Sequence, residues 1–261
     1  MTIAGSDSSA GAGIQADLKT FAAFGVYGTS VITAITAQNT QGVARVEALS
    51  PEMVAAQIDA VVTDIGADVV KTGMLGSAGV IEVVASKLRQ HNLSPLVLDP
   101  VLAASDGSAL LEDGAVALLW EKLLPLALIV TPNVDEAGAL VGRRLGGPED
   151  LRRAAQEIVD MGARNVVITG GDGSGPAVDL FYDGEHYHEF AAARVDTTNT
   201  HGTGCTFAAA IAASLAKGSM PRQAVAVAKA YVTKAMQMSY PLGHGNGPVH
   251  HFFRYWQDVS A

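Results

Sequence analysis

The sequence predicts an α/β fold in which helices cover both faces of a mostly parallel sheet with a short antiparallel edge. Short β-branched runs alternate with amphipathic segments, a pattern typical of parallel strands joined by helices. The 28 glycines and 6% aromatic residues favour tight turns between strands and helices over an aromatic-rich β-sandwich. With 261 residues, 49% of them hydrophobic, the chain can fill one core, and we expect a single domain over residues 1–261.

The expected elements follow in order along the chain. A first strand ends at Ala4, and β-branched runs predict further strands at residues 31–35, 68–71, 96–99, 128–130 and 166–168. Ser50-Pro51 and Gly147-Pro148 predict helix starts, because serine caps a first turn and proline fits its first position. Residues 178–190 predict an antiparallel hairpin that turns at Asp183-Gly184. Residues 202–261 are expected to be helical, with a break between Lys217-Gly218 and Pro221.

Charge and cysteine content narrow the classes of function. A net charge of −9 argues against nucleic-acid and anionic-membrane partners, because both kinds of binding depend on basic patches. A single cysteine excludes an intrachain disulfide, and the first residues lack the basic start and apolar run of a secretory signal. Charged residues or proline interrupt each apolar stretch before it reaches the roughly 20 residues of a membrane span. We expect a cytoplasmic protein.

A glycine-rich segment at residues 199–206 predicts an anion site. Gly202 and Gly204 open an alanine-rich helix, whose first-turn N–H groups have no intrahelical partner and carry a partial positive charge that favours phosphate oxygens. Cys205 follows, where chemistry would take place. His201 precedes the segment and has two interpretations, a phosphate contact or a structural hydrogen bond.

The loop after the first strand has a second glycine motif. Gly11 to Ala16 matches the dinucleotide fingerprint G-x-G-x-x-G/A, which would indicate an NAD(P)-dependent oxidoreductase. A polar loop separates this motif from the strand, and the stretch around position 36 lacks the acidic residue for the ribose, so a loop that approaches a small ligand is favoured. Asp17 follows the motif and either points its carboxylate at that ligand or balances the helix dipole.

Motifs along the whole chain resemble one enzyme family. Residues 2–21, 33–40, 71–75, 98–101, 131–133, 199–206 and 247–252 fall in the order and spacing of the hydroxymethylpyrimidine/phosphomethylpyrimidine kinases. The resemblance implies a ribokinase-like fold and a homodimer. It also implies two ATP-dependent phosphorylations in thiamine biosynthesis, first of 4-amino-5-hydroxymethyl-2-methylpyrimidine and then of its monophosphate.

The resemblance assigns roles at the transfer point and in the acceptor pocket. Gly202, Thr203 and Gly204 would cradle the transferring phosphoryl group, and Cys205 would act as base or orienting group, its pKa lowered by the helix N-terminus; the alternative for Cys205 is a buried inert thiol. Gln38 offers a donor and an acceptor that can pair with a ring nitrogen and an exocyclic amine. The other residues expected around the ring are Gly5, Asp17, Met74 and Val101.

The nucleotide side has the remaining assignments. Asp99, at the end of a strand, is the candidate Mg²⁺ ligand, or else caps the next turn. Asn133 and Glu136 match positions near the phosphates and metal, although Asn133 also suits a helix N-cap. The resemblance to ribokinase-like enzymes also allows a monovalent cation near the cradle. The full set of expected nucleotide-binding residues is Asn133, Glu136, Thr169, Asn199 and Thr200.

Three departures from the family pattern keep other functions open. Thr169 stands where the family has a lysine, Ala10 replaces a glycine, and Ala103-Ala104 occupies a position that often holds a lysine. Loss of these positive groups motivates the alternative of a non-catalytic pyrimidine-binding or regulatory protein. A pyridoxal or pyridoxine kinase is the closer alternative, because that ring also carries a hydroxymethyl group, but Gln38 favours the pyrimidine.

Overall fold

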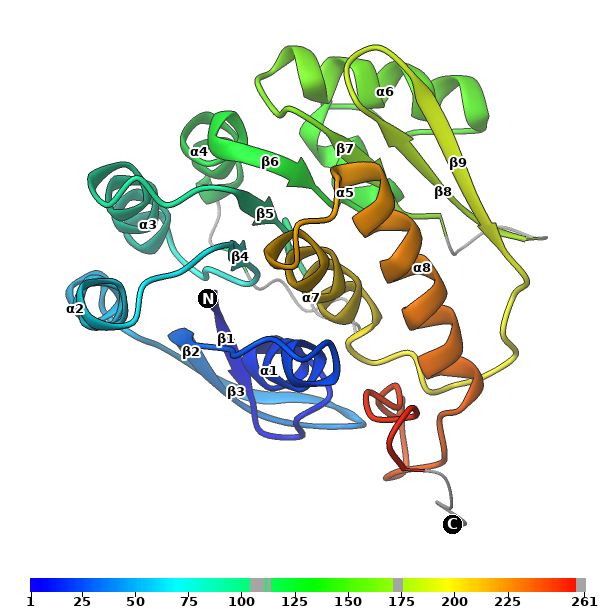
Figure 1. Ribbon diagram of the computed structural model, residues 1–261, viewed down its shortest axis with the longest axis horizontal. Coiled ribbons are helices and arrows are strands. Elements are labelled where there is room, and N and C mark those ends of the chain that lie inside the picture. Colours follow the sequence, from blue (N-terminus) through cyan, green and yellow to red (C-terminus); the bar gives the residue numbers. More distant parts are fainter. Residues whose placement is uncertain (104–110, 112–113, 171–175, 257–261) are drawn as a thin grey trace.

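The computed structural model describes residues 1–103, 111, 114–170 and 176–256. Their strands are β1 (Thr2–Asp7), β2 (Ser30–Asn39), β3 (Gly42–Ala48), β4 (Val70–Thr72), β5 (Leu96–Leu98), β6 (Ala127–Val130), β7 (Val166–Ile168), β8 (Ala177–Tyr182) and β9 (Tyr187–Ala192). They form a sheet in the order β3-β2-β1-β4-β5-β6-β7-β8-β9 (Figure 1). Neighbouring strands in the run β2-β1-β4-β5-β6-β7 pair in parallel, as the alternating pattern predicts.

Antiparallel strands lie at both edges of the sheet. The β8–β9 hairpin confirms the predicted edge, with Asp183 and Gly184 in its turn and Gly184 at φ +94°. Strand β3 pairs with β2 and forms a second antiparallel edge that was not predicted. The first strand was also placed too short, because β1 runs to Asp7, past an irregularity in its pairing with β2 between Ala4 and Ser6.

Helices cover both faces of the sheet (Figure 1). One face carries α1 (Gly13–Ala23), α7 (Thr203–Ala216) and α8 (Pro221–Gln237); the other carries α2 (Pro51–Asp64), α3 (Ala78–Gln90), α4 (Ala115–Lys122), α5 (Val134–Leu140) and α6 (Pro148–Asp160), and η1 (Leu124–Leu126) precedes β6. Alternation along each strand separates the two cores. In β5, for example, Leu96 and Leu98 belong to the core cluster that includes residues of α2 and α3, whereas Val97 belongs to the cluster that includes α7.

The helix boundaries follow their capping residues. The Ser50 side chain accepts a hydrogen bond from the Met53 amide at the start of α2, and Pro148 opens α6. Helix α7 is buried on nearly all sides because it packs against α1, α8, β4 and β5, which explains its alanine-rich sequence. The expectation of helix up to residue 261 was wrong for residues 238–256, which form turns and irregular segments after α8.

The sheet directs the carboxyl ends of its parallel strands toward the edge where α7 begins (Figure 1). Ligands of open parallel sheets bind at such an edge. None of the helices in the described ranges combines the length and the apolar character needed to cross a bilayer.

Candidate active site

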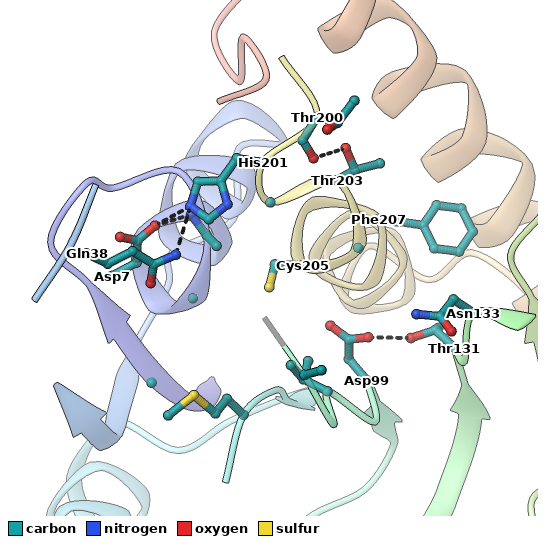
Figure 2. Close-up of a pocket in the computed structure, with 18 of the residues that line it drawn as sticks. Asp7, Gln38, Asp99, Thr131, Asn133, Thr200, His201, Thr203, Cys205 and Phe207 are labelled. Carbon is teal, nitrogen blue, oxygen red and sulfur yellow. Dashed lines mark hydrogen bonds and ion pairs between the residues drawn. The ribbon is translucent and has the colours of Figure 1, made fainter. Parts of the chain in front are cut away.

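A pocket lies at the carboxyl ends of β1, β2, β4, β5, β6 and β7, beside the first turn of α7. Figure 2 shows Asp7, Gln38 and His201 on one side of Cys205, and Asp99, Thr131 and Asn133 on the other. Most residues predicted for the site line this pocket, namely Gly5, Gln38, Met74, Asp99, Val101, Asn133, Glu136, Thr169, Thr200, Gly202, Thr203, Gly204 and Cys205.

The first turn of α7 has the geometry expected of an anion site. Gly202 takes φ +79°, and a Cβ atom there would lie 1.8 Å from the Gly11 carbonyl oxygen, so the turn requires glycine. At Gly204 an added Cβ would meet no atom within 4 Å, which leaves the space above the helix N-terminus open to a ligand. The Thr203 hydroxyl donates to the Thr200 carbonyl at 2.6 Å and closes the turn.

Asp7 organises the loop that faces this turn, a role that the sequence did not reveal. Its carboxylate accepts from the amides of Ser9, Gly11 and Ala12 at 2.8, 3.1 and 2.8 Å. His201 Nε2 lies 2.8 Å from Asp7 Oδ2. The Gly11 and Ala12 amides therefore bind Asp7 and are not available to a pyrophosphate.

Gly5, Gln38, Met74 and Val101 line the part of the pocket expected to hold an acceptor ring. A Cβ atom at Gly5 would lie 3.3 Å from the Met74 sulfur, so glycine lets the methionine side chain lie close to β1. Asp17, expected beside the ring, is absent from the lining.

Asp17 instead lies in the core and pairs with Lys71 of β4. Lys71 Nζ donates to Asp17 Oδ1 and Oδ2 at 3.0 and 2.9 Å, the Thr2 hydroxyl donates to Oδ2 at 2.6 Å, and the Asp17 and Lys71 side chains are both 0% exposed. Burial alone would lower the pKa of Lys71, but Asp17, Cys205 and Asp99 outweigh it and raise that pKa above its ordinary value. Lys71 therefore stays charged. The sequence did not reveal this charged group beside the site, because its partner Asp17 lies 54 residues away in the chain.

Cys205 faces the pocket, but its expected low pKa was wrong. Burial raises the pKa of the thiol to about 12, with Lys71 opposing the shift and Asp99 adding to it. The helix N-terminus is thus outweighed by desolvation and by nearby carboxylates. At neutral pH the side chain is a thiol that can orient a ligand, and not a ready-made thiolate base.

Asp99 holds a carboxylate oxygen ready for a ligand. Its Oδ1 accepts from the Thr131 hydroxyl at 3.1 Å, while the buried Oδ2 has no hydrogen-bond partner within the described residues and lies 3.7 Å from Lys71 Nζ. Burial raises the pKa of Asp99, and Lys71 opposes that shift. Burial and the neighbouring Asp99 also raise the pKa of Glu136 to about 8. A divalent cation near the carboxylates of Asp99 and Glu136 would offset the repulsion between their negative charges.

Asn133 and Glu136 form a capping box at the start of α5. The Asn133 side chain accepts from the Glu136 amide at 2.8 Å, and the Glu136 carboxylate accepts from the Asn133 amide at 2.9 Å. Asn133 is therefore the N-cap that the sequence allowed, and it also lines the pocket beside Thr169. Its contact with a nucleotide stays a prediction. Ala103 lines the pocket, whereas Ala104 lies outside the described residues.

Asn199 is the second predicted residue absent from the lining. Its side-chain amide donates to the Ser239 hydroxyl at 3.2 Å, and its backbone amide donates to the Thr197 hydroxyl at 3.1 Å. The bond to Ser239 ties the segment before α7 to the residues that follow α8, so Asn199 supports the segment that leads into the cradle. Pocket residues that the sequence did not single out include Ser6, Asp7, Thr36, Thr131 and Phe207.

Two solved kinase structures have this fold, and one of them is a complex with a nucleotide analogue and pyridoxal. The pyridoxal kinase from Staphylococcus aureus in complex with AMP-PCP and pyridoxal matches with a TM-score of 0.89 and 38% identity, over 97% of this chain and 94% of that one. The phosphomethylpyrimidine kinase from Clostridium difficile 630 matches with a TM-score of 0.81 and 42% identity, over 90% of this chain and 97% of that one. Fold and pocket together define a ribokinase-like small-molecule kinase.

Sequence comparison identifies the family within that class. The phosphomethylpyrimidine kinase family profile matches residues 7–250. The hydroxymethylpyrimidine/phosphomethylpyrimidine kinase of Rhizobium meliloti is 52% identical over 99% of this chain and 98% of its own length. The thiamine biosynthesis bifunctional protein ThiED of Geobacter sulfurreducens is 51% identical over 96% of this chain, which spans 51% of that protein. The chain belongs to the phosphomethylpyrimidine kinase family.

Proposed function

We propose that this chain transfers phosphate from ATP to the hydroxymethyl group of 4-amino-5-hydroxymethyl-2-methylpyrimidine, and then phosphorylates the resulting monophosphate, in thiamine biosynthesis. The observation that supports this most is the two-sided pocket around the open face of Gly204. Its lining includes the half-buried carboxamide of Gln38 and the apolar side chain of Met74. It also includes the unpartnered oxygen of Asp99 near the capping box of α5. Phosphoryl transfer needs this combination of positioning and charge neutralisation.

The roles proposed for the residues follow from their chemistry. Gln38 would pair with the ring nitrogen and amine of the pyrimidine, while Met74 and Val101 contact its faces. The amides of Gly204 and Cys205 would meet the oxygens of the transferring group, which gain charge in the transition state, while the Thr203 amide donates to the Thr200 carbonyl at 3.2 Å and holds the turn.

Cys205 would orient the acceptor hydroxyl through its thiol. Because the raised pKa keeps the sulfur protonated, the hydroxyl proton would pass late in the transfer to an oxygen of the phosphoryl group and from there to water, which a loose transition state permits.

The metal side of the proposal rests on Asp99 and Glu136. No group of three or more His, Cys, Asp or Glu side chains in the described residues is arranged to hold an ion alone, so Mg²⁺ would share its coordination with phosphate oxygens and water. The unpartnered Asp99 Oδ2 and the raised pKa of Glu136 fit such an ion. When bound, Mg²⁺ would neutralise phosphate charge. Thr169 and Thr200 would contact the nucleotide as neutral hydroxyls.

The experiment that tests the function is direct product identification. Purified protein is incubated with Mg-ATP and the pyrimidine alcohol, and in parallel with pyridoxal, and products are identified by mass spectrometry. Pyrimidine monophosphate and diphosphate support the proposal, whereas phosphate on pyridoxal alone assigns a vitamin B6 kinase. Pyrimidine binding without any product would support the non-catalytic alternative.

A pair of glutamine variants gives this assay a matched control. Gln38→Met keeps the side-chain length and removes the carboxamide from the pocket, so pyrimidine phosphorylation should fall. Gln41→Met makes the same change at an exposed position three residues along and should leave the products unchanged.

We further propose that the chain works as one kinase domain over residues 1–261, as a cytoplasmic homodimer and without a nucleic-acid or membrane partner. The family resemblance supports the dimer, and the acidic net charge of −9 supports the absence of those partners. Light scattering of the purified protein measures the oligomeric state. Potassium titration of the activity tests for the monovalent cation that the superfamily suggests.

A further inference from the structure

Both the main chain and the side chain of Gln38 are held by contacts with neighbouring segments. The β2–β3 register shifts between Ala37 and Gln38, an irregularity that re-aims a side chain. The Ser8 hydroxyl then fixes the backbone at this point, since it accepts from the Gln38 amide at 2.8 Å and donates to the Gln38 carbonyl at 2.7 Å. The main chain of Gln38 is thereby anchored to the loop after β1.

The carboxamide of Gln38 is contacted at both ends. The Thr36 hydroxyl lies 3.1 Å from its oxygen, and Thr36 is itself buried and contacts the Ser6 carbonyl at 3.1 Å. At the other end, His201 Nε2 lies 3.5 Å from the Gln38 amide nitrogen. Figure 2 shows Asp7, Gln38 and His201 grouped on one side of the pocket. These contacts restrict rotation of the carboxamide about its last bond.

His201 is in turn fixed by Asp7. The two side chains are 6% and 4% exposed and 2.8 Å apart. Although burial would raise the pKa of Asp7, the hydrogen bonds from His201, Ser9 and the loop amides lower it below its ordinary value. An ionised carboxylate only accepts hydrogen bonds, so the proton between the two residues lies on His201 Nε2. That proton is directed at Asp7 and orients the ring, so His201 meets the Gln38 amide nitrogen as a packing contact and not as a hydrogen-bond acceptor.

The backbone and ring of His201 are held by two further segments. The His201 amide donates to the Gly247 carbonyl at 3.0 Å. A Cβ atom at Gly11 would lie 2.3 Å from His201 Cδ2 and 3.2 Å from Pro248 Cβ, so the ring fits only against glycine. The C-terminal motif around Gly247 and Pro248 thus reaches the acceptor pocket through His201.

We propose that Asp7, His201 and Thr36 are positioning residues that fix the plane of the Gln38 carboxamide, and that this clasp makes the pocket prefer an aminopyrimidine alcohol over pyridoxal. The inference rests on the proposed function. An aminopyrimidine offers an acceptor nitrogen and a donor amine side by side, which a carboxamide pairs with in one plane, as glutamine does with adenine. Pyridoxal lacks that pair of groups. Loosening the carboxamide therefore weakens pyrimidine binding and has little effect on pyridoxal.

The test measures binding of both alcohols to variants by calorimetry, without ATP. Thr36→Val keeps the side-chain shape and removes the hydroxyl at the oxygen end. His201→Leu removes the ring nitrogen, and His201→Gln restores an N–H group that can reach Asp7. The expected result for Thr36→Val is about tenfold weaker pyrimidine binding, the factor for one neutral hydrogen bond, with pyridoxal affinity within about twofold. His201→Leu, which removes the packing contact with Gln38 and the tie to Asp7, should also weaken pyrimidine binding, by a smaller factor and with the same small effect on pyridoxal. His201→Gln recovers most of the His201→Leu loss.

The control variant is Thr63→Val, which makes the same change as Thr36→Val at an exposed position of α2, where the Thr63 hydroxyl donates to the Asp59 carbonyl. It should bind the pyrimidine as the parent protein does. Equal losses for both alcohols, unchanged pyrimidine affinity in Thr36→Val and His201→Leu, or failure of His201→Gln to recover binding would each overturn the clasp.

This outcome is separate from that of the proposed function. The absence of phosphorylated product in the parent protein overturns the kinase reaction, while the calorimetric affinities still decide the clasp. Where turnover is measurable, the clasp also predicts a raised KM for the pyrimidine with kcat and the KM for ATP little changed, a split that general loss of structure does not produce.

Discussion

The buried Lys71–Asp17 pair provides the sharpest test of the conclusion that Asp17 is a core residue and not a ligand contact. Lys71→Met removes an ammonium that donates to both Asp17 oxygens at 3.0 and 2.9 Å in a fully buried position. Asp17 then keeps the Thr2 hydroxyl as a donor but loses its counter-charge. Leaving one partner of such a pair alone costs about 3–5 kcal/mol of stability. A loss of that size lowers the unfolding midpoint of a chain this long by on the order of 10 °C.

The full experiment compares Lys71→Met, Asp17→Asn and the double variant by urea unfolding at neutral pH. Asp17→Asn should be the milder single change, because Asp99 Oδ2 remains 3.7 Å from Lys71 Nζ and partly replaces the lost carboxylate. The double variant should recover at least half of the Lys71→Met loss, since it leaves neither charge without its partner. Weaker pyrimidine binding in Asp17→Asn, with an unchanged free energy of unfolding, would refute this account and restore Asp17 as a ring contact.

Three further outcomes are expected. Gly204→Ala should fold normally but lose at least about tenfold in turnover, because its methyl group occupies open space in the pocket at the start of α7. Gly202→Ala should also destabilise the fold, since its Cβ would lie 1.8 Å from the Gly11 carbonyl oxygen. Equal stability of the two variants in thermal unfolding contradicts this expectation. With its pKa near 12, Cys205 should react with iodoacetamide at pH 8 at least about a hundredfold more slowly than free cysteine, as followed by mass spectrometry on the native and urea-unfolded chain. The pKa of Asp7 in the folded protein lies below its ordinary 3.8, so ionised Asp7 stabilises the fold above that pH, and this stabilisation is lost as pH falls through the lower folded value. The difference in free energy of unfolding between the parent protein and Asp7→Asn, measured in urea, should therefore narrow in acid. A constant difference contradicts the role of Asp7 as an ionised acceptor.

The strand pattern could be predicted from the sequence because each parallel strand is a local feature. The runs at residues 96–99 and 166–168 correspond to β5 and β7, and the loops expected to bind ligand do line the pocket. Strand β3 was missed although Val43 and Val46 lie in it, because its pairing with β2 is an edge contact and most of its side chains are exposed. An exposed edge strand has little apolar periodicity to detect.

The errors at the site share a physical cause, which is dependence on contacts between distant segments. The position of Asp17 near the first loop suggested a ligand contact, but the face of α1 that carries it meets Lys71, 54 residues away. The sequence placed Cys205 at a helix N-terminus, where its pKa would fall, yet gave no measure of its burial or of its distance from Asp99. Asn199 was assigned to the nucleotide with its motif, although its side chain turns away toward Ser239.

The charge of the pocket decides how phosphate can be held there. In the described part of the chain the lining includes Asp7, Asp99 and Glu136 but neither lysine nor arginine, and residues 104–110, 112–113, 171–175 and 257–261 contain none in their sequence. Lys71 lies close by, but its hydrogen bonds are directed at Asp17. The α7 N-terminus offers about half a positive charge, far less than a triphosphate carries. We therefore expect nucleotide affinity to depend on bound cations more steeply than in relatives with a lysine at the position of Thr169.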